Sequence, residues 1–145
     1  MYHLLFASAL FIASSLTSCS FSSDYAREPV SSGKNFLKSK LTELEAIKGQ
    51  HTFKKHGFSP DGPYAGWIQQ LRLKVDTNNV DTEEARAVAD GATLLEQLAY
   101  DYVSWISFEG DKHCRKVSGI EVGDSCHIKQ SIKLKTLKIR KMIDE

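Results

Sequence analysis

Two cysteines near the C-terminus each stand beside a histidine, as His113-Cys114 and Cys126-His127. Thiolate and imidazole are ligands that zinc prefers, and four of them would complete a tetrahedral site. The spacing matches no known zinc-binding motif, however, and adjacent side chains point in diverging directions. We therefore expect no metal site and no other cofactor. The two cysteines could instead form a disulfide, which requires an oxidising compartment.

The remaining residues with catalytic potential are loop histidines. His51 and His56 lie among turn-forming residues, and either of them, or His113, could act with Asp61 or Asp111 as an acidic partner. A zinc-protease motif needs Glu after its first histidine, whereas Thr52 follows His51. The chain also lacks a nucleophile elbow, a phosphate-binding loop and a dinucleotide fingerprint. We therefore favour the interpretation that these histidines are exposed in a loop and have no catalytic role.

A rigid turn with aromatic neighbours is a candidate contact with another protein. Residues 59–63, Ser-Pro-Asp-Gly-Pro, predict the turn, because proline fixes φ and glycine permits positive φ. Phe58, Tyr64 and Trp67 lie beside it, and aromatic side chains are enriched in protein interfaces. For Trp67 the alternative is packing in the core.

The N-terminal residues are typical of an export signal. Residues 4–16, LLFASALFIASSL, form an uncharged run that is too short to span a bilayer and suits a signal peptide. The run ends at Leu16-Thr17-Ser18-Cys19, which resembles the lipobox of bacterial lipoproteins: an aliphatic residue, two small residues and a cysteine. This resemblance covers only the N-terminal signal. It implies cleavage before Cys19 and attachment of lipid to its sulfur.

In the lipoprotein interpretation, residues 1–18 are the signal peptide, residues 19–33 a lipidated flexible tether, and residues 34–145 one mainly helical globular domain. Ser20 follows the cysteine where Asp would imply retention in the inner membrane, so the resemblance implies the outer membrane, facing the periplasm, in a Gram-negative host. A secreted protein and an uncleaved anchor are the two alternatives.

The lipoprotein interpretation also explains why the chain has an odd number of cysteines, namely three. If lipid consumes Cys19, then Cys114 and Cys126 remain as a pair in an oxidising compartment. A disulfide is their simplest state there, with zinc binding as the alternative.

Helical periodicity dominates the predicted domain. Apolar residues recur at steps of three and four in residues 34–48, 64–75 and 82–108, which predicts three amphipathic helices. The last helix has the longest and widest apolar stripe, so we expect it to be central. Gly91 falls inside it, either to allow close packing or to permit a slight bend.

The C-terminal residues are ambiguous. Residues 109–127 predict a short strand or a loop. From Ile128 onward, apolar residues partly alternate with lysine as in a strand, and we favour a strand that pairs with residues 116–122 as a disulfide-clipped hairpin. The alternative is a helix that leaves Leu134 and Leu137 opposite its apolar face. The expected fold class is therefore mainly α, with about three helices and a C-terminal hairpin or helix, and α+β as the alternative.

A net charge of +1 conceals a polarised chain of 145 residues. Residues 81–111 carry eight acidic residues and one basic, a net charge of −7, whereas residues 127–145 carry six basic and two acidic, a net charge of +4. The two segments either neutralise each other in part, or the basic one meets lipid headgroups or an acidic partner. The candidate contact residues are Lys133, Lys135, Lys138, Arg140 and Lys141.

These features together predict a lipid-anchored protein of the bacterial cell envelope that acts by non-catalytic protein–protein binding. It would be an accessory subunit of an envelope machine, or a protective factor that confers immunity or exclusion. We expect no nucleic-acid partner, no catalytic residue and no small-molecule substrate. The alternative function is a small periplasmic hydrolase or metal-binding protein that uses the loop histidines.

Overall fold

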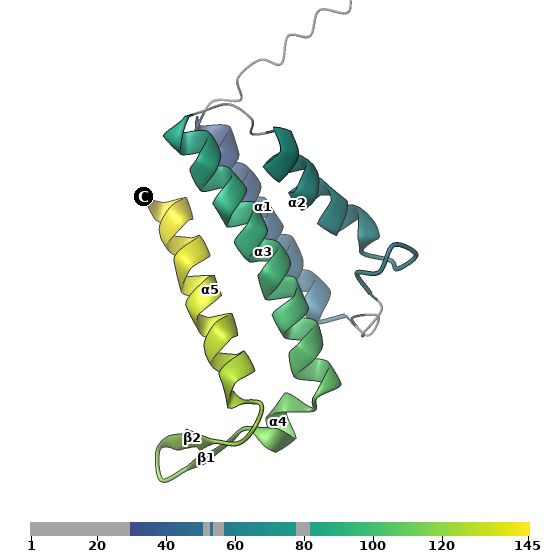
Figure 1. The fold of residues 1–145 in the computed structure, drawn as a ribbon, viewed down its shortest axis with the longest axis vertical. Coiled ribbons are helices and arrows are strands. Elements are labelled where there is room, and N and C mark those ends of the chain that lie inside the picture. Colours follow the sequence, from purple (N-terminus) through teal and green to yellow (C-terminus); the bar gives the residue numbers. More distant parts are fainter. Residues whose placement is uncertain (1–29, 51–52, 54–56, 78–81) are drawn as a thin grey trace, which may run out of the picture.

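Helices make up most of residues 30–50, 53, 57–77 and 82–145, the part of the chain that the computed structural model describes (Figure 1). They are α1 (Val30–Lys48), α2 (Ala65–Thr77), α3 (Glu83–Ser107), α4 (Gly110–His113) and α5 (Cys126–Asp144). A two-stranded hairpin of β1 (Arg115–Val117) and β2 (Ile120–Val122) stands between α4 and α5. The predicted mainly α fold class is confirmed.

Helix α3 is central, as its wide apolar stripe predicted. It packs against α1, α2 and α5, and α1 also contacts α5. The long helices α1, α2, α3 and α5 run in alternating directions, so α3 lies antiparallel to α2 and α5 (Figure 1). At the start of α3, the side chain of Thr82 accepts a hydrogen bond from the Ala85 N–H at 3.2 Å and caps the helix.

The core forms where these helices meet. Its largest fully buried side chains come from all four long helices: Leu37, Leu44, Leu71, Leu95, Leu98 and Ile139. Burial of each such side chain stabilises the folded state by roughly 1.5–3 kcal/mol relative to leaving it exposed. The bundle therefore depends on every long helix contributing apolar residues to one shared core.

Gly91 allows α1 and α3 to approach closely. A Cβ atom at this position would lie 2.6 Å from Cδ1 of Leu37, which is only 1% exposed. Of the two roles expected for Gly91, close packing is therefore the one that the structure supports. The glycine lowers the intrinsic helix propensity of α3 but permits the contact with α1.

The favoured strand at the C-terminus is wrong, because residues 126–144 form helix α5. Ile128 and Ile139 are buried against the bundle, whereas Leu134 and Leu137 are exposed on the other side of the helix. The hairpin also differs from the prediction, since both of its strands lie within residues 115–122. Burial of apolar residues at helical spacing therefore favours the helix more than the partial alternation with lysine favours a strand.

Helix α1 starts earlier than expected. It begins at Val30, so residues 30–33 at the end of the predicted tether are helical. Gly33 is buried here, and a Cβ atom would lie 2.5 Å from Cγ2 of Val88 in α3. The contact with α3 explains why the helix extends beyond the predicted boundary at residue 34.

The replacement Gly91→Ala tests the close packing of α1 on α3. Although alanine favours helix by about 1 kcal/mol, we expect a net loss of about 1–3 kcal/mol in the free energy of unfolding, because the methyl group displaces Leu37. Urea denaturation measures the effect. The matched control is Gly66→Ala in α2, where a Cβ atom would meet nothing within 4 Å. A Gly91→Ala protein as stable as this control would contradict the account.

Candidate functional site

The hairpin between α4 and α5 is closed at its base by Cys114 and Cys126. Their Sγ atoms lie 2.09 Å apart and their Cα atoms 4.9 Å apart, so the predicted pairing is confirmed. Cys114 directly precedes β1, and Cys126 is the first residue of α5. The bond therefore ties the start of the hairpin to the helix that follows it.

Two backbone features shape the hairpin. Ser118 and Gly119 both have positive φ, of 51° and 86°, as the tight turns of two-residue hairpins require. Gly123, with φ of 136°, lies directly against α4, where a Cβ atom would be 1.7 Å from the carbonyl oxygen of His113. Only glycine fits this position, where the returning strand passes the end of α4.

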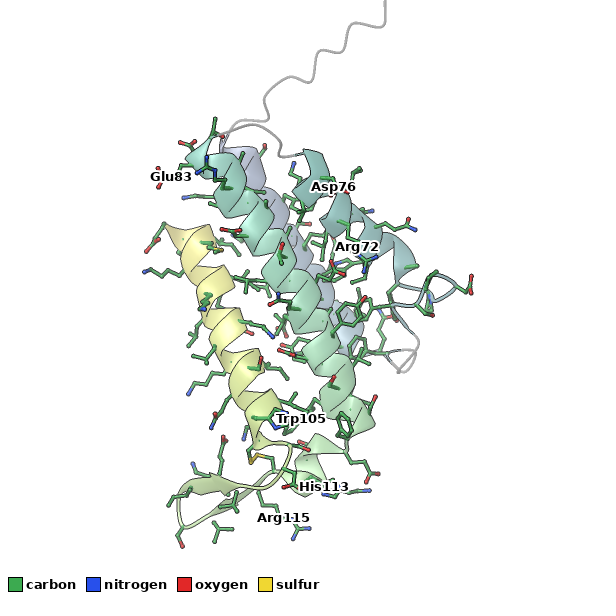
Figure 2. All side chains as sticks on the ribbon, viewed as in Figure 1. Arg72, Asp76, Glu83, Trp105, His113 and Arg115 are labelled. Carbon is green, nitrogen blue, oxygen red and sulfur yellow. A yellow bond between two sulfur atoms is a disulfide. The ribbon has the colours of Figure 1, made fainter. Side chains whose placement is uncertain are left out.

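The end of α3 packs against α4, the short helix that precedes the hairpin. Gly110, the first residue of α4, is buried against the indole of Trp105, and a Cβ atom there would lie 2.2 Å from Cδ2 of the ring. Figure 2 shows Trp105, His113 and Arg115 at this end of the bundle, with Glu83 and Asp76 at the other end. The hairpin thus stands on a base held by a disulfide and by two glycine contacts.

The strand register gives the hairpin two chemically distinct faces. Lys116 pairs with Glu121, and the Glu121 carboxylate accepts an ion-paired hydrogen bond from Lys129 of α5 at 2.5 Å. This bond from Lys129 lowers the pKa of the Glu121 carboxyl. The pairs Arg115–Val122 and Val117–Ile120 lie on the opposite face, because side chains alternate along a strand. That second face is directed away from α5.

Three apolar side chains of this second face are exposed. The exposed fractions are 58% for Val117, 67% for Ile120 and 55% for Val122. We define these three residues as the hairpin apolar face. Sequence reasoning missed it, although the available signal was Val-Ser-Gly-Ile, a two-residue turn with apolar residues on either side.

The aromatic residues expected to contact a partner lie elsewhere. Phe58 and Trp67 are only 5% and 6% exposed, so their assignment to a contact surface is wrong and the core alternative for Trp67 is right. The Phe58 ring centroid lies 5.5 Å from that of Phe53 and 5.6 Å from that of Trp67. Aromatic rings at this spacing bury each other, which is why they pack inside. Tyr64 is partly buried against the same cluster.

Tyr64 and Trp67 also line an open groove between α1 and the start of α2, together with Glu43, Gln50 and Gln70. Several polar groups of this groove pair with one another, although the buried indole nitrogen of Trp67 has no hydrogen-bond partner among the described residues. The Tyr64 hydroxyl donates to Oε1 of Gln50 at 2.7 Å, and Glu43 accepts from Lys40 at 2.8 Å. The groove therefore presents no convergent set of groups for catalysis.

The basic residues of α5 divide into two kinds. Lys135 donates to Asp101 of α3 at 2.6 Å, Asp101 also accepts from Ser131 at 2.7 Å, and the Lys135 side chain is only 21% exposed. The ammonium group of Lys135 is therefore paired within the bundle, which disfavours the contact role predicted for it. Lys133, Lys138, Arg140 and Lys141 are exposed. The sequence suggested that acidic residues 81–111 and basic residues 127–145 neutralise each other in part. The Lys135–Asp101 pair is one such contact between the two segments.

The described residues among those considered for metal binding do not form a metal site. Within the described ranges, no three His, Cys, Asp or Glu side chains form a group that could hold a metal ion. Cys114 and Cys126 bond to each other, and Nδ1 of exposed His127 lies 2.6 Å from the carbonyl oxygen of Asp124. His51, His56 and the proposed lipidation site Cys19 lie outside the described residues.

None of the helices described here combines the length and the apolar character needed to cross a bilayer.

Reduction tests the disulfide at the hairpin base. With the cysteines 12 positions apart, the chain-entropy model gives a loss of about 3 kcal/mol in the free energy of unfolding when the bond is broken. Urea denaturation with and without reductant measures it, and the control is the double variant Cys114→Ser with Cys126→Ser, which reductant should not affect. Equal midpoints for the unmodified chain in both conditions would rule out a stabilising bond.

Comparison of this chain with protein-family models, with curated proteins and with solved structures finds no match. The chain is therefore assigned to no family on these grounds. What it does must be argued from its own residues, and the hairpin apolar face is the feature that most needs an explanation.

Proposed function

We propose that this chain is a lipid-anchored protein of the bacterial cell envelope, and that it binds another protein through the hairpin apolar face. The observation that carries the proposal is the exposure of Val117, Ile120 and Val122 on a hairpin whose base is held by a disulfide. The role proposed for this face is binding without catalysis.

The stability of the hairpin supports this role. A two-stranded hairpin in isolation is marginally stable in water, and β1 and β2 have only three residues each. The chain nevertheless holds it in place with the Cys114–Cys126 bond, the contact of Gly123 with His113 and the ion pair of Glu121 with Lys129. These features fix a hairpin whose apolar side chains contribute little to the core. Such pre-organisation lowers the entropy cost of binding.

The chemistry of the face defines the partner. Burial of three β-branched side chains favours a partner surface that is apolar at its centre. Arg115 shares the face, and among the described residues its side chain donates to the carbonyl oxygen of Lys112 at 3.1 Å and forms no ion pair. A carboxylate at the edge of the partner surface would complement this guanidinium.

The position of the hairpin is compatible with an N-terminal anchor. The hairpin lies at one end of the bundle, whereas α1 begins at the other (Figure 1). An anchor attached ahead of α1 would therefore leave the hairpin uncovered. An accessory subunit of an envelope machine and a protective factor both need such an accessible contact on a membrane-attached body.

Site-specific photo-crosslinking tests the proposal. A photoreactive amino acid replaces Ile120 in the full chain, expressed in the organism from which it comes. We expect one discrete adduct with a second protein after irradiation. The matched control places the same amino acid at Leu73 of α2, which is 63% exposed, and should give no such adduct.

The variant Val122→Asp provides the second control. The charge should abolish the adduct from position 120, because a carboxylate in an apolar contact is costly to bury. Val122 is exposed, so the melting temperature should stay the same. An adduct that persists in this variant, or one that forms equally from position 73, would count against the proposed contact.

A further inference from the structure

We propose that the solvent-facing side of α5 is a docking surface for an anionic lipid bilayer. The surface consists of Lys133, Leu134, Leu137, Lys138 and Lys141, with Arg140 at its edge. This inference goes beyond the proposed function, because it concerns a different element and does not require the partner of the hairpin.

Two leucines occupy the middle of this surface. Leu134 is 60% exposed and Leu137 is 55% exposed, whereas Ile139 is fully buried. Two residues turn an α-helix by about 200°, so Leu137 lies almost opposite Ile139 and faces away from the bundle. A solvent-facing helix side normally carries polar residues at its centre. Here its centre is apolar.

Basic residues flank the leucines on both sides. At about 100° per residue, Lys133 and Arg140 fall on one side of the two leucines and Lys138 falls on the other, while Lys141 falls between them in angle, one turn after Leu137. Lys141 pairs with exposed Glu145 at 3.3 Å, while Lys133, Lys138 and Arg140 form no ion pair within the described residues. The acidic residues of this helix and its cap, Asp144 and Glu145, are confined to its C-terminal end. The surface is therefore basic along most of its length.

A bilayer fits this pattern better than a protein partner does. Long basic side chains extend their apolar stems along an apolar surface and leave the charge at headgroup level. Helices that lie in the membrane interface combine an apolar centre with flanking Lys and Arg. A protein partner would need an apolar recess with carboxylates on both sides of it. An anionic bilayer offers an apolar interior and negatively charged headgroups to any such helix.

The consequence is a defined orientation. With α5 against the bilayer, the bundle would lie on its side, and the hairpin, which precedes α5, would lie near the membrane at one end of the bundle (Figure 1). An N-terminal anchor would raise the effective concentration of the bilayer near α5, so even a weak attraction would suffice. The partner of the hairpin would then itself lie at the membrane surface.

Chemical labelling of lysines tests this orientation. The full chain is reconstituted in vesicles of phosphatidylcholine alone and in vesicles that also contain phosphatidylglycerol. An amine-acetylating reagent is then added, and mass spectrometry quantifies the label at each lysine. We expect Lys133 and Lys138 to be labelled severalfold more slowly in the anionic vesicles. Lys38, exposed on α1, should be labelled equally in both.

Paired variants identify the residues responsible, with the protection of Lys141 as the readout. Lys133→Gln and Lys138→Gln should each weaken docking about fivefold, which corresponds to about 1 kcal/mol per basic residue at an anionic surface. Leu134→Gln combined with Leu137→Gln should abolish the protection. Leu73→Gln in α2 is the matched leucine control, and Lys112→Gln in α4 is the matched lysine control.

The outcomes separate this inference from the proposed function. Val122→Asp should leave lysine protection unchanged even if it abolishes crosslinking from the hairpin. Equal labelling of Lys133 and Lys138 in the two kinds of vesicle overturns the docking surface. Lysine protection that persists after both leucines are replaced also overturns the docking surface. It would mean that the lysines are attracted to the bilayer without insertion of Leu134 and Leu137.

Discussion

Helix α5 is fixed in rotation by its packing against α3, and both candidate surfaces depend on this packing. Ile139 is fully buried, Ile128 nearly so, and Lys135 reaches Asp101 of α3 at 2.6 Å. Any rotation of α5 about its axis would expose the isoleucines and break the ion pair. With the rotation fixed, Leu134 and Leu137 must face outward. The same helix begins with Cys126, so its placement also fixes the base of the hairpin.

The hairpin and α5 together give the protein two surfaces with different chemistry. The hairpin apolar face has Arg115 at its edge and no acidic residue of its own. The outer side of α5 combines two leucines with several basic residues. In our account the first surface recognises a protein and the second a bilayer. The bundle core connects them, so a protein bound at the hairpin and a bilayer at α5 would be held in one relative orientation.

The sequence predicts the bundle better than it predicts either surface. Helix α3 could be predicted because apolar residues recur at one helical period over its whole length, and those between Val88 and Ala99 are buried. The C-terminal helix could not, because Leu134 and Leu137 are apolar without being buried, which makes the pattern resemble a strand. The hairpin apolar face was missed for a geometric reason: a two-residue turn separates Val117 from Ile120, so the alternation shifts at the turn. Phe58 and Trp67 look like contact residues beside a turn, yet mutual packing buries them.

The central claim is that the hairpin apolar face is covered by another protein in the cell envelope. Amide hydrogen exchange of residues 115–122, followed by mass spectrometry, tests it most directly. The full chain is measured in envelope membranes of its own organism and again in vesicles made from the lipids of those membranes. The account predicts slower exchange of this segment in the envelope membranes than in the protein-free vesicles. Equal exchange in the two preparations would contradict it.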